Sequence, residues 1–399
     1  MRVLIAPVGE QPTPNLIPLF AARQQLGSAY EYVQYLVSRD ERINEVANHL
    51  CQALAQDPDM QGLEIAPLLS MDAWNLTKAR QDCATAIRKA IEYAHKRDGD
   101  TQVTVNLTGG TKIMSLAAYQ AACEAQVSMV YVNTAQSEII QFGSDGNPLV
   151  PHSFKVVISI QTQLRAAGKE FKKCPQRPIQ RPGSVPQDRA AFVKWLVSNY
   201  DAAYEHCLKR MIFEARQTRK PWQQEVQYAF EPKGKGLDAV QRLEAMGLLR
   251  WNTTQRSLRV VDEPAWGFMN GGWVETFALI SLAESNWFDE VLGNLEVEGF
   301  EGEIDTVVTR NGRLGIVECK TKGPQGEGAT FAAAKIRQHE MILGGPYART
   351  FFALPSNENI EDIQKASTQF GIGDPIYEDP QKGIRLKDLP RKVYEGLSS

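Results

Sequence analysis

The first 160 residues alternate between short apolar runs and longer segments in which apolar residues recur every three or four positions. The runs predict strands, and the three-to-four-residue spacing predicts helices. Because strands and helices alternate, the pattern favours a parallel, Rossmann-like α/β sheet with strands buried on both faces. The expected strands are 3–8, 30–37, 63–69, 101–107 and 127–132, followed by 138–142 and 154–160, and the expected helices are 15–26, 42–55, 73–96 and 111–125.

Two loops lie where expected strands lead into helices. The first is Gly9-Glu10-Gln11-Pro12-Thr13-Pro14-Asn15, and the second is Asn106-Leu107-Thr108-Gly109-Gly110-Thr111-Lys112. Ligands of open α/β sheets bind at this edge, where glycines admit a phosphate to main-chain N–H groups and a helix N-terminus favours anions. Thr111 can cap the helix. Each loop alone also fits an ordinary strand-to-helix turn, but Thr-Gly-Gly-Thr-Lys favours a phosphate-bearing ligand; it is neither a P-loop nor a dinucleotide motif.

The middle of the chain changes character. Residues 161–188 combine prolines and basic residues without periodicity, as in Lys172-Lys173-Cys174-Pro175, which predicts a linker. Residues 189–262 then show helical patterns and a strand pair that together resemble a winged helix. Such modules can bind DNA, and the available cations are Arg242, Arg250, Arg256 and Arg259. The alternative, which we favour, is a structural spacer between the flanking domains.

Residues 263–399 contain the most informative pattern, a predicted β-hairpin. Asn311-Gly312 separates two runs rich in β-branched residues, with Asp305 before the turn and Glu318-Cys319-Lys320 after it. Period-two alternation puts Glu318 and Lys320 on one face and Cys319 on the other. The carboxylates are suitable ligands for Mg²⁺ or Mn²⁺, and the lysine can orient a water or offset charge on a phosphate. A Glu-x-Lys pair on a surface strand is also typical of a simple ion pair.

The hairpin resembles the PD-(D/E)xK nuclease superfamily. Gly271-Gly272-Trp273-Val274-Glu275 precedes it and begins an amphipathic run, so the resemblance assigns Glu275 as the helical acidic residue. It implies catalysis by Glu275, Asp305, Glu318 and Lys320, with the metal held by Asp305, Glu318, the main-chain carbonyl of Cys319 and Glu275. The superfamily often adds a polar residue from the next helix, for which the candidates are Lys335, Gln338 and His339.

The N-terminal loops, taken with this hairpin, resemble the CARF-domain nucleases of type III CRISPR defence. The resemblance implies a CARF sensor domain (1–160), a linker (161–188), a winged-helix-like spacer (189–262) and a nuclease domain (263–399). The implied activator is cyclic tetra-adenylate, bound across the two-fold axis of a homodimer, and the implied substrate is DNA, with single-stranded RNA as a second substrate. The activator-binding positions carried over are Gly9, Glu10, Gln11, Thr13, Asn15, Asn106, Thr108, Gly109, Gly110, Thr111, Lys112 and, more loosely, Asn133.

The composition of the chain excludes few of these predictions. The 399 residues, 43% of them hydrophobic, can form several cores. The net charge of −3 provides no global basic field, so any nucleic-acid site must be local. No apolar run reaches the roughly 18 residues that span a bilayer. The six cysteines show no zinc-binding spacing and suggest a reducing cytoplasm.

The residues alone leave other functions open. A ligand-responsive transcription regulator would use the middle segment to bind DNA and would not cleave it. A ring nuclease would degrade only its own cyclic nucleotide in the N-terminal domain. A stand-alone restriction or repair nuclease would cut without any activator.

Overall fold

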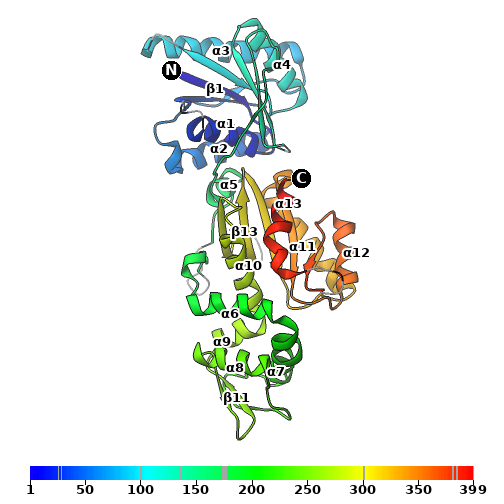
Figure 1. The fold of residues 1–399 in the computed structure, drawn as a ribbon. Coiled ribbons are helices and arrows are strands. Elements are labelled where there is room, and N and C mark those ends of the chain that lie inside the picture. Colours follow the sequence, from blue (N-terminus) through cyan, green and yellow to red (C-terminus); the bar gives the residue numbers. More distant parts are fainter. Residues whose placement is uncertain are drawn as a thin grey trace.

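The computed structural model describes residues 1–25, 27, 29–98, 101–134, 136–172, 178–299, 302–379, 382 and 385–398. The molecule is elongated, with the N-terminal domain at one end and the C-terminal sheet in the middle (Figure 1). Residues 189–262 lie at the far end, beyond the C-terminal sheet. The expectation that this segment separates the two domains is therefore wrong, because the C-terminal sheet contacts the N-terminal domain directly.

The N-terminal domain has three layers around a sheet of order β3-β2-β1-β5-β6-β7-β8, with β4 also pairing with β2. Side chains alternate along β1: Leu4 packs with α1 and α2, whereas Val3 and Ile5 pack with α3 and α4 on the other face. This is the predicted Rossmann-like architecture. Its elements are β1 (Arg2–Pro7), α1 (Thr13–Gln24), β2 (Tyr32–Val37), α2 (Glu41–Gln56), η1 (Pro58–Met60), β3 (Glu64–Ile65), β4 (Leu69–Ser70), α3 (Leu76–Asp98), β5 (Gln102–Asn106), α4 (Lys112–Glu124), β6 (Ser128–Asn133), β7 (Glu138–Phe142) and β8 (His152–Ser153).

Some predicted elements in this domain differ from the structure. The expected strand at 63–69 is split into β3 and β4, which pair with different parts of β2. The expected strand at 154–160 does not form, although Phe154, Val156 and Ile158 are buried in alternation. That stretch pairs with no strand within the described part of the chain, so its period-two pattern indicates alternating burial and not a strand. The predicted end of the first helix, residue 26, lies outside the described residues.

The expected linker is partly built into the C-terminal sheet. Helix α5 (Ile160–Ala166) supplies Ile160 and Leu164 to the sheet's core. Gln180 exchanges both main-chain hydrogen bonds with Gly293 of β12, at 2.8 and 2.9 Å. These contacts cover the edge of β12, which would otherwise expose unpaired main-chain groups. The basic and proline-rich run at 173–177 lies outside the described residues.

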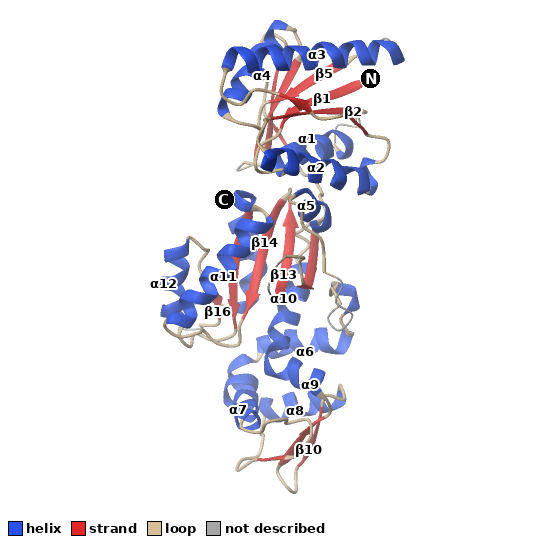
Figure 2. Ribbon diagram, turned by 180° about the vertical axis from the view of Figure 1, so that it is seen from behind, coloured by secondary structure: helices blue, strands red, loops and turns tan. Residues whose placement is uncertain are grey.

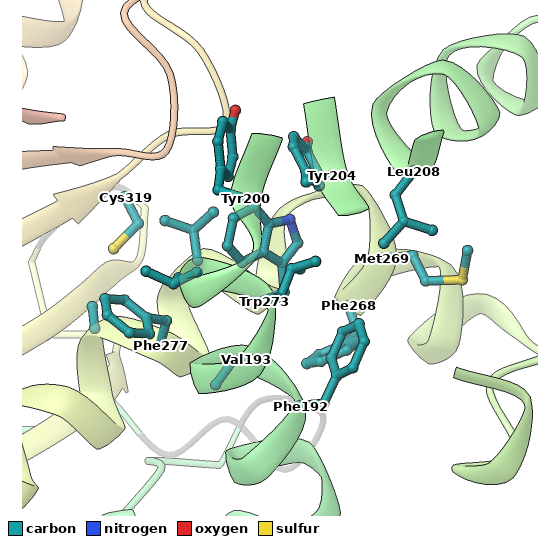
Figure 3. Packing of buried hydrophobic residues seen from close by; sticks show 14 of the residues in the cluster. Phe192, Val193, Tyr200, Tyr204, Leu208, Phe268, Met269, Trp273, Phe277 and Cys319 are labelled. Atoms are coloured by element: carbon teal, nitrogen blue, oxygen red, sulfur yellow. The ribbon is translucent and has the colours of Figure 1, made fainter. Parts of the chain in front are cut away.

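The segment 189–262 shares one hydrophobic core with the C-terminal sheet (Figure 3). Trp273 lies at the centre of this core, only 1% exposed, with its ring 4.9 Å from that of Tyr204. Phe192 packs on one side of it and Cys319 of the sheet belongs to the same cluster. The segment is therefore fixed to the sheet. The short helix η2 (Pro182–Ser184) precedes the segment, and α6 (Gln187–Ser198) begins just before it. The elements that follow are the π-helical η3 (Asp201–Leu208), α7 (Lys209–Arg216), β9 (Val226–Gln227), α8 (Lys235–Ala245), β10 (Leu249–Asn252) and β11 (Ser257–Val260).

A small sheet of order β10-β11-β9 lies beside α8 and forms the tip of the molecule. Arg250, Arg256 and Arg259, three of the cations noted in the winged-helix resemblance, are exposed there. Arg242 instead stacks on the ring of Trp195, 4.6 Å from its centroid. That arginine is therefore engaged in packing within the segment.

The C-terminal sheet has the order β12-β13-β14-β15-β16 (Figure 2). The predicted hairpin is confirmed: Asn311 (φ 49°) and Gly312 (φ 74°) form its turn, both with the positive φ that a type I′ turn requires. The sequence predicted an amphipathic helix here, but α10 is buried on nearly all sides. The sheet covers one side of the helix and residues 189–262 cover another. The elements are α9 (Glu263–Gly267), the π-helical η4 (Phe268–Gly272), α10 (Trp273–Glu284), β12 (Glu290–Leu295), β13 (Ile304–Arg310), β14 (Arg313–Cys319), α11 (Glu327–Leu343), η5 (Gly345–Tyr347), β15 (Ala348–Leu354), α12 (Ile360–Phe370), β16 (Ile376–Tyr377), η7 (Leu386–Asp388) and α13 (Leu389–Ser398).

The tip of this hairpin packs against the N-terminal domain. A Cβ atom placed on Gly312 would lie 3.4 Å from side-chain carbons of both Ile17 and Ile158. Gln163 of α5 donates a hydrogen bond of 2.6 Å to the Thr309 hydroxyl of β13. The other end of the hairpin therefore points away from the N-terminal domain.

Among the described helices, none combines the length and apolar character needed to cross a bilayer.

Candidate active site and sensor cavity

The Asp, Glu and Lys of the sequence motif meet at the end of the hairpin remote from its turn. The register pairs Thr306 of β13 with Val317 of β14, which places Asp305 opposite Glu318. The main-chain N–H of Cys319 donates to Asp305 Oδ2 at 2.6 Å, and Lys320 Nζ donates to Glu318 Oε1 at 2.5 Å. The hairpin thus brings together three side chains that the sequence separates.

Burial and mutual repulsion shape the charges of this cluster. Burial, followed by the nearby carboxylates of Glu318 and Glu275, holds the pKa of Asp305 well above its ordinary value. Burial opposes the charge on Lys320, but Glu318 and Asp305 outweigh it and raise the pKa of that lysine. Glu275, in the first turn of α10, is thus close enough to act electrostatically on Asp305.

These residues fit a divalent cation. Glu318 is only 7% exposed, and its Oε2 atom is buried without a hydrogen-bond partner among the described residues. A cation would satisfy that oxygen and relieve the repulsion between the carboxylates. No three His, Cys, Asp or Glu side chains within the described ranges are preassembled to hold an ion. Mg²⁺ sites commonly use one or two carboxylates, with waters and substrate oxygens completing the shell.

Cys319 contributes to this cluster through its main chain alone. Its thiol is buried in the hydrophobic core next to Phe277 (Figure 3). Burial raises the pKa of that thiol well above its ordinary value. If Cys319 contacts a metal, its carbonyl group is therefore the atom available, because the thiol points into the core.

Helix α11 approaches the cluster from the opposite side of the sheet to α10. His339 is 1% exposed, and burial lowers its pKa to about 4, with Glu318 among the charges acting on it. Lys335 reaches towards Gly302, where an added Cβ would lie 2.9 Å from its Nζ atom. Gln338 is on the exposed face. Of the three candidates on this helix, His339 interacts electrostatically with Glu318 and Lys335, whereas Gln338 is exposed to solvent.

The two predicted loops of the N-terminal domain line a cavity of about 610 Å³ at the carboxyl edge of the sheet. The loops touch closely: a Cβ on Gly109 would lie 2.0 Å from the Pro7 carbonyl oxygen, and one on Gly9 would lie 3.1 Å from the Gly110 nitrogen. The predicted residues on the cavity wall are Gly9, Glu10, Gln11, Thr108, Gly109, Gly110 and Thr111. Thr111 also caps α4 as expected, accepting from the Met114 N–H at 3.2 Å.

Other predicted positions support the loops from behind. Asn106 is fully buried and donates to Asn15 Oδ1 (2.9 Å) and the Pro14 carbonyl (3.1 Å), while its own oxygen accepts from the Thr108 N–H and hydroxyl. Asn15 is equally buried and donates to the Pro7 carbonyl at 3.3 Å. Both asparagines therefore position the loops. Thr13, Lys112 and Asn133 are also outside the cavity lining.

The cavity contains residues that the sequence analysis missed. Arg39 and Arg42 follow β2, Trp74 follows β4, and Tyr347 comes from η5 of the C-terminal domain. Trp74 is 83% exposed. Ligands of open α/β sheets bind where the strands end, and applying this to the ends of β2 and β4 would have found Arg39, Arg42 and Trp74. No sequence signal pointed to Tyr347, which lies some 240 positions after the second loop and more than 330 positions after the first.

A Rossmann-like domain with a loop-lined cavity, joined to a sheet that carries Asp, Glu and Lys on one hairpin, defines a nuclease with an attached ligand-binding domain. Family models match both parts: the Card1 CARF domain over residues 3–162 and the Card1-like endonuclease domain over residues 262–374. The chain belongs to the CARF-domain nucleases of the Card1 type, the family that its motifs resembled. No curated protein sequence matches it.

Solved structures share this fold at low sequence identity. Protein VC1899 from Vibrio cholerae superposes with a TM-score of 0.74 at 18% identity, over 99% of this chain and 98% of its own. Can2 from Sulfobacillus thermosulfidooxidans, in complex with cyclic tetra-adenylate, gives 0.71 at 16% identity over the full length of both chains. A type III CRISPR defence DNA nuclease activated by cyclic oligoadenylate gives 0.53 at 16% identity, over 90% of this chain and 47% of its own.

Proposed function

We propose that this protein is a metal-dependent endonuclease of type III CRISPR defence, activated by a cyclic oligoadenylate. Cyclic tetra-adenylate is the preferred candidate, because a structure with the same fold over its full length was solved with that ligand. DNA is the first candidate substrate and single-stranded RNA the second. The endonuclease domain and the Asp305–Glu318–Lys320 cluster support the nuclease activity.

The proposal that the activator controls the nuclease rests on one contact between the domains. Tyr347 of the C-terminal domain lines the cavity of the N-terminal domain. The same turn packs on the first loop, where a Cβ on Gly345 would lie 2.6 Å from Gln11 Nε2. It directly follows α11, which carries His339 towards Glu318. A ligand in the cavity would thus touch a segment that continues into the helix beside the cleavage site.

The chemistry follows from the hairpin cluster. A divalent cation, Mn²⁺ or Mg²⁺, held by Asp305, Glu318 and the Cys319 carbonyl, with Glu275 completing the shell, would polarise the phosphate and stabilise its developing charge. Lys320, kept protonated by its two carboxylate neighbours, orients the attacking water in line with the leaving oxygen. The Cys319 N–H holds Asp305 in place through its 2.6 Å hydrogen bond.

Regulation requires that the activator bind one arrangement of the domains better than another. We propose a homodimer in which one cyclic molecule spans the two N-terminal cavities. Shifting an equilibrium from 1:99 to 99:1 would need about 5.5 kcal/mol of preference. Main-chain N–H groups of the glycine loops, Arg39 and Arg42 offer contacts to several phosphates in each subunit.

The first experiment is a cleavage assay on supercoiled plasmid, single-stranded DNA and single-stranded RNA, with Mn²⁺ or with EDTA, and with or without cyclic tetra- or hexa-adenylate. We expect cleavage that requires both the metal and the tetra-adenylate. Equal cleavage without any activator would indicate a stand-alone nuclease. No cleavage in any mixture, together with loss of the added cyclic nucleotide, would indicate a ring nuclease.

The Tyr347→Ala variant is expected to lose most of the activator response, because it removes the side chain of the C-terminal domain that lines the cavity. A typical coupling free energy between two sites changes binding affinity about 5- to 150-fold. We therefore expect the stimulation of cleavage by the activator to fall by about that factor. Cleavage rates at saturating activator, compared with rates without it, measure the effect. Tyr347→Phe keeps the ring and serves as the control. Full stimulation in Tyr347→Ala would exclude this residue from the coupling.

A further inference from the structure

A second cavity, of about 420 Å³, opens beside the candidate active site between helices η3 and α7 and the loop after β14. Thr321 and Lys322, which line it, directly follow Lys320. The other wall belongs to residues 189–262, whose role the sequence left open. We call this cavity the lateral groove. Besides Tyr204 and Glu205, its charged and aromatic lining consists of Lys209, Arg210, Phe213, Arg216, Lys322 and Glu358.

The lateral groove is locally basic. Four lysine and arginine side chains line it against two carboxylates, those of Glu205 and Glu358, although the whole chain carries a net charge of −3. Arg216 Nε donates to Asn270 Oδ1 at 2.7 Å, which ties the groove to η4, directly before the helix of Glu275. The positive wall is therefore held in a fixed position relative to the catalytic cluster.

Glu358 occupies a position in the groove that suits a phosphate. Its carboxylate lies between Lys209 (3.2 Å) and Lys322 (3.8 Å), which come from the two opposite walls. Although burial opposes the charge, Glu205 and Glu358 hold the pKa of Lys209 above its ordinary value. A phosphodiester has the same charge and also offers two oxygens, so it can take the place of this carboxylate between the two ammonium groups.

Helix α7 presents an aromatic ring between two guanidinium groups. Arg210, Phe213 and Arg216 are spaced three residues apart and share one face of the helix. Phe213 is 62% exposed, and Arg210 is fixed by stacking on the Phe230 ring at 4.2 Å. An exposed ring beside cations is the arrangement that stacks an unpaired base while the cations contact the backbone. In a duplex the bases are already stacked, so this arrangement favours a single strand.

We propose that a single strand of nucleic acid, DNA or RNA, runs through the lateral groove to reach Lys320, with a base stacked on Phe213 and a phosphate between Lys209 and Lys322. The groove gives residues 189–262 the role of a substrate clamp. This inference rests on the proposed nuclease function and specifies how that site receives its substrate.

The test is binding of fluorescently labelled single-stranded DNA and RNA, and of the matching duplexes, to the full-length protein in EDTA, with and without cyclic tetra-adenylate. In Arg210→Ala/Phe213→Ala, affinity for single strands should fall by roughly 10- to 100-fold. The slope of log affinity against log salt should fall by about 0.7 for the lost cation. Glu358→Gln should bind severalfold more tightly, because it removes the negative charge that lies between Lys209 and Lys322. Comparing DNA with RNA in the same assay identifies the strand.

Arg256→Ala/Arg259→Ala, on the exposed strand pair at the tip, is the matched control and should bind as the wild type does. Weaker binding in this control alone would overturn the proposal in favour of a DNA-binding wing. Wild-type affinity in Arg210→Ala/Phe213→Ala would also overturn it. Because binding is measured in EDTA, a strand that binds the groove but is never cut with Mn²⁺ would refute the nuclease function and not the groove.

Discussion

Glu318→Gln is expected to lower activator-stimulated cleavage at least ~10²-fold, by analogy with the loss of a preorganised charge stabiliser. The amide keeps the size of the side chain but removes the charge that pairs with Lys320 and would bind the cation. The Oε2 atom of Glu318 is buried and has no hydrogen-bond partner among the described residues, so the proposed cation would satisfy it. Single-turnover cleavage of the best substrate at saturating activator and Mn²⁺ measures the loss.

Glu361→Gln is the matched control, because Glu361 is an exposed carboxylate on α12 of the same domain. It should cleave at the wild-type rate. Calorimetry should show that Glu318→Gln still binds cyclic tetra-adenylate, since the cavity of the N-terminal domain lies beyond the other end of the hairpin. Retained cleavage in Glu318→Gln would place the catalytic centre elsewhere in the molecule.

Gly109→Ala is expected to weaken activator binding by about one to two orders of magnitude, since overpacking a tight contact costs about 1–3 kcal/mol. A Cβ at this position would lie 2.0 Å from the main-chain oxygen of Pro7, which cannot rotate away. The two loops must therefore separate, and the N–H groups that line the cavity move with them. Isothermal titration of cyclic tetra-adenylate measures the loss, and a thermal melt records how much stability changes.

Gly183→Ala carries the same substitution where an added Cβ meets nothing within 4 Å. It should bind the activator with wild-type affinity and unfold at the wild-type temperature. Unchanged affinity in a folded Gly109→Ala protein would show that the activator does not depend on the contact between these loops.

The sequence alone determined the features that depend on neighbouring residues. Asn311-Gly312 specifies a tight hairpin because both positions accept positive φ, and the hairpin then aligns Asp305 with Glu318. Alternating strand and helix patterns specified the Rossmann-like sheet, and Thr111 capped its helix as expected. These outcomes follow from local conformational preferences and from the burial of periodic apolar residues.

The sequence-based predictions were wrong where the structure of a segment depends on the parts of the chain that pack around it. The buried alternation at 154–160 predicted a strand, but a strand also needs a partner with free main-chain groups. Asn15 and Asn106 had the right chemistry for a ligand, but the fold places them behind the loops, where buried amides must satisfy each other. The helix of Glu275 was predicted to have a polar face, yet it lies between the sheet and residues 189–262.

Only the tertiary structure decided how the parts cooperate. Tyr347 reaches the cavity of a domain that ends nearly two hundred residues before it, and Lys322 faces α7 across the lateral groove. Such contacts arise from how whole domains pack, and no short-range pattern encodes them. The sequence thus determined the catalytic hairpin and the glycine loops, because each is a local structure. The proposed routes that join activator, hairpin and substrate depend on surfaces that exist only once the chain has folded.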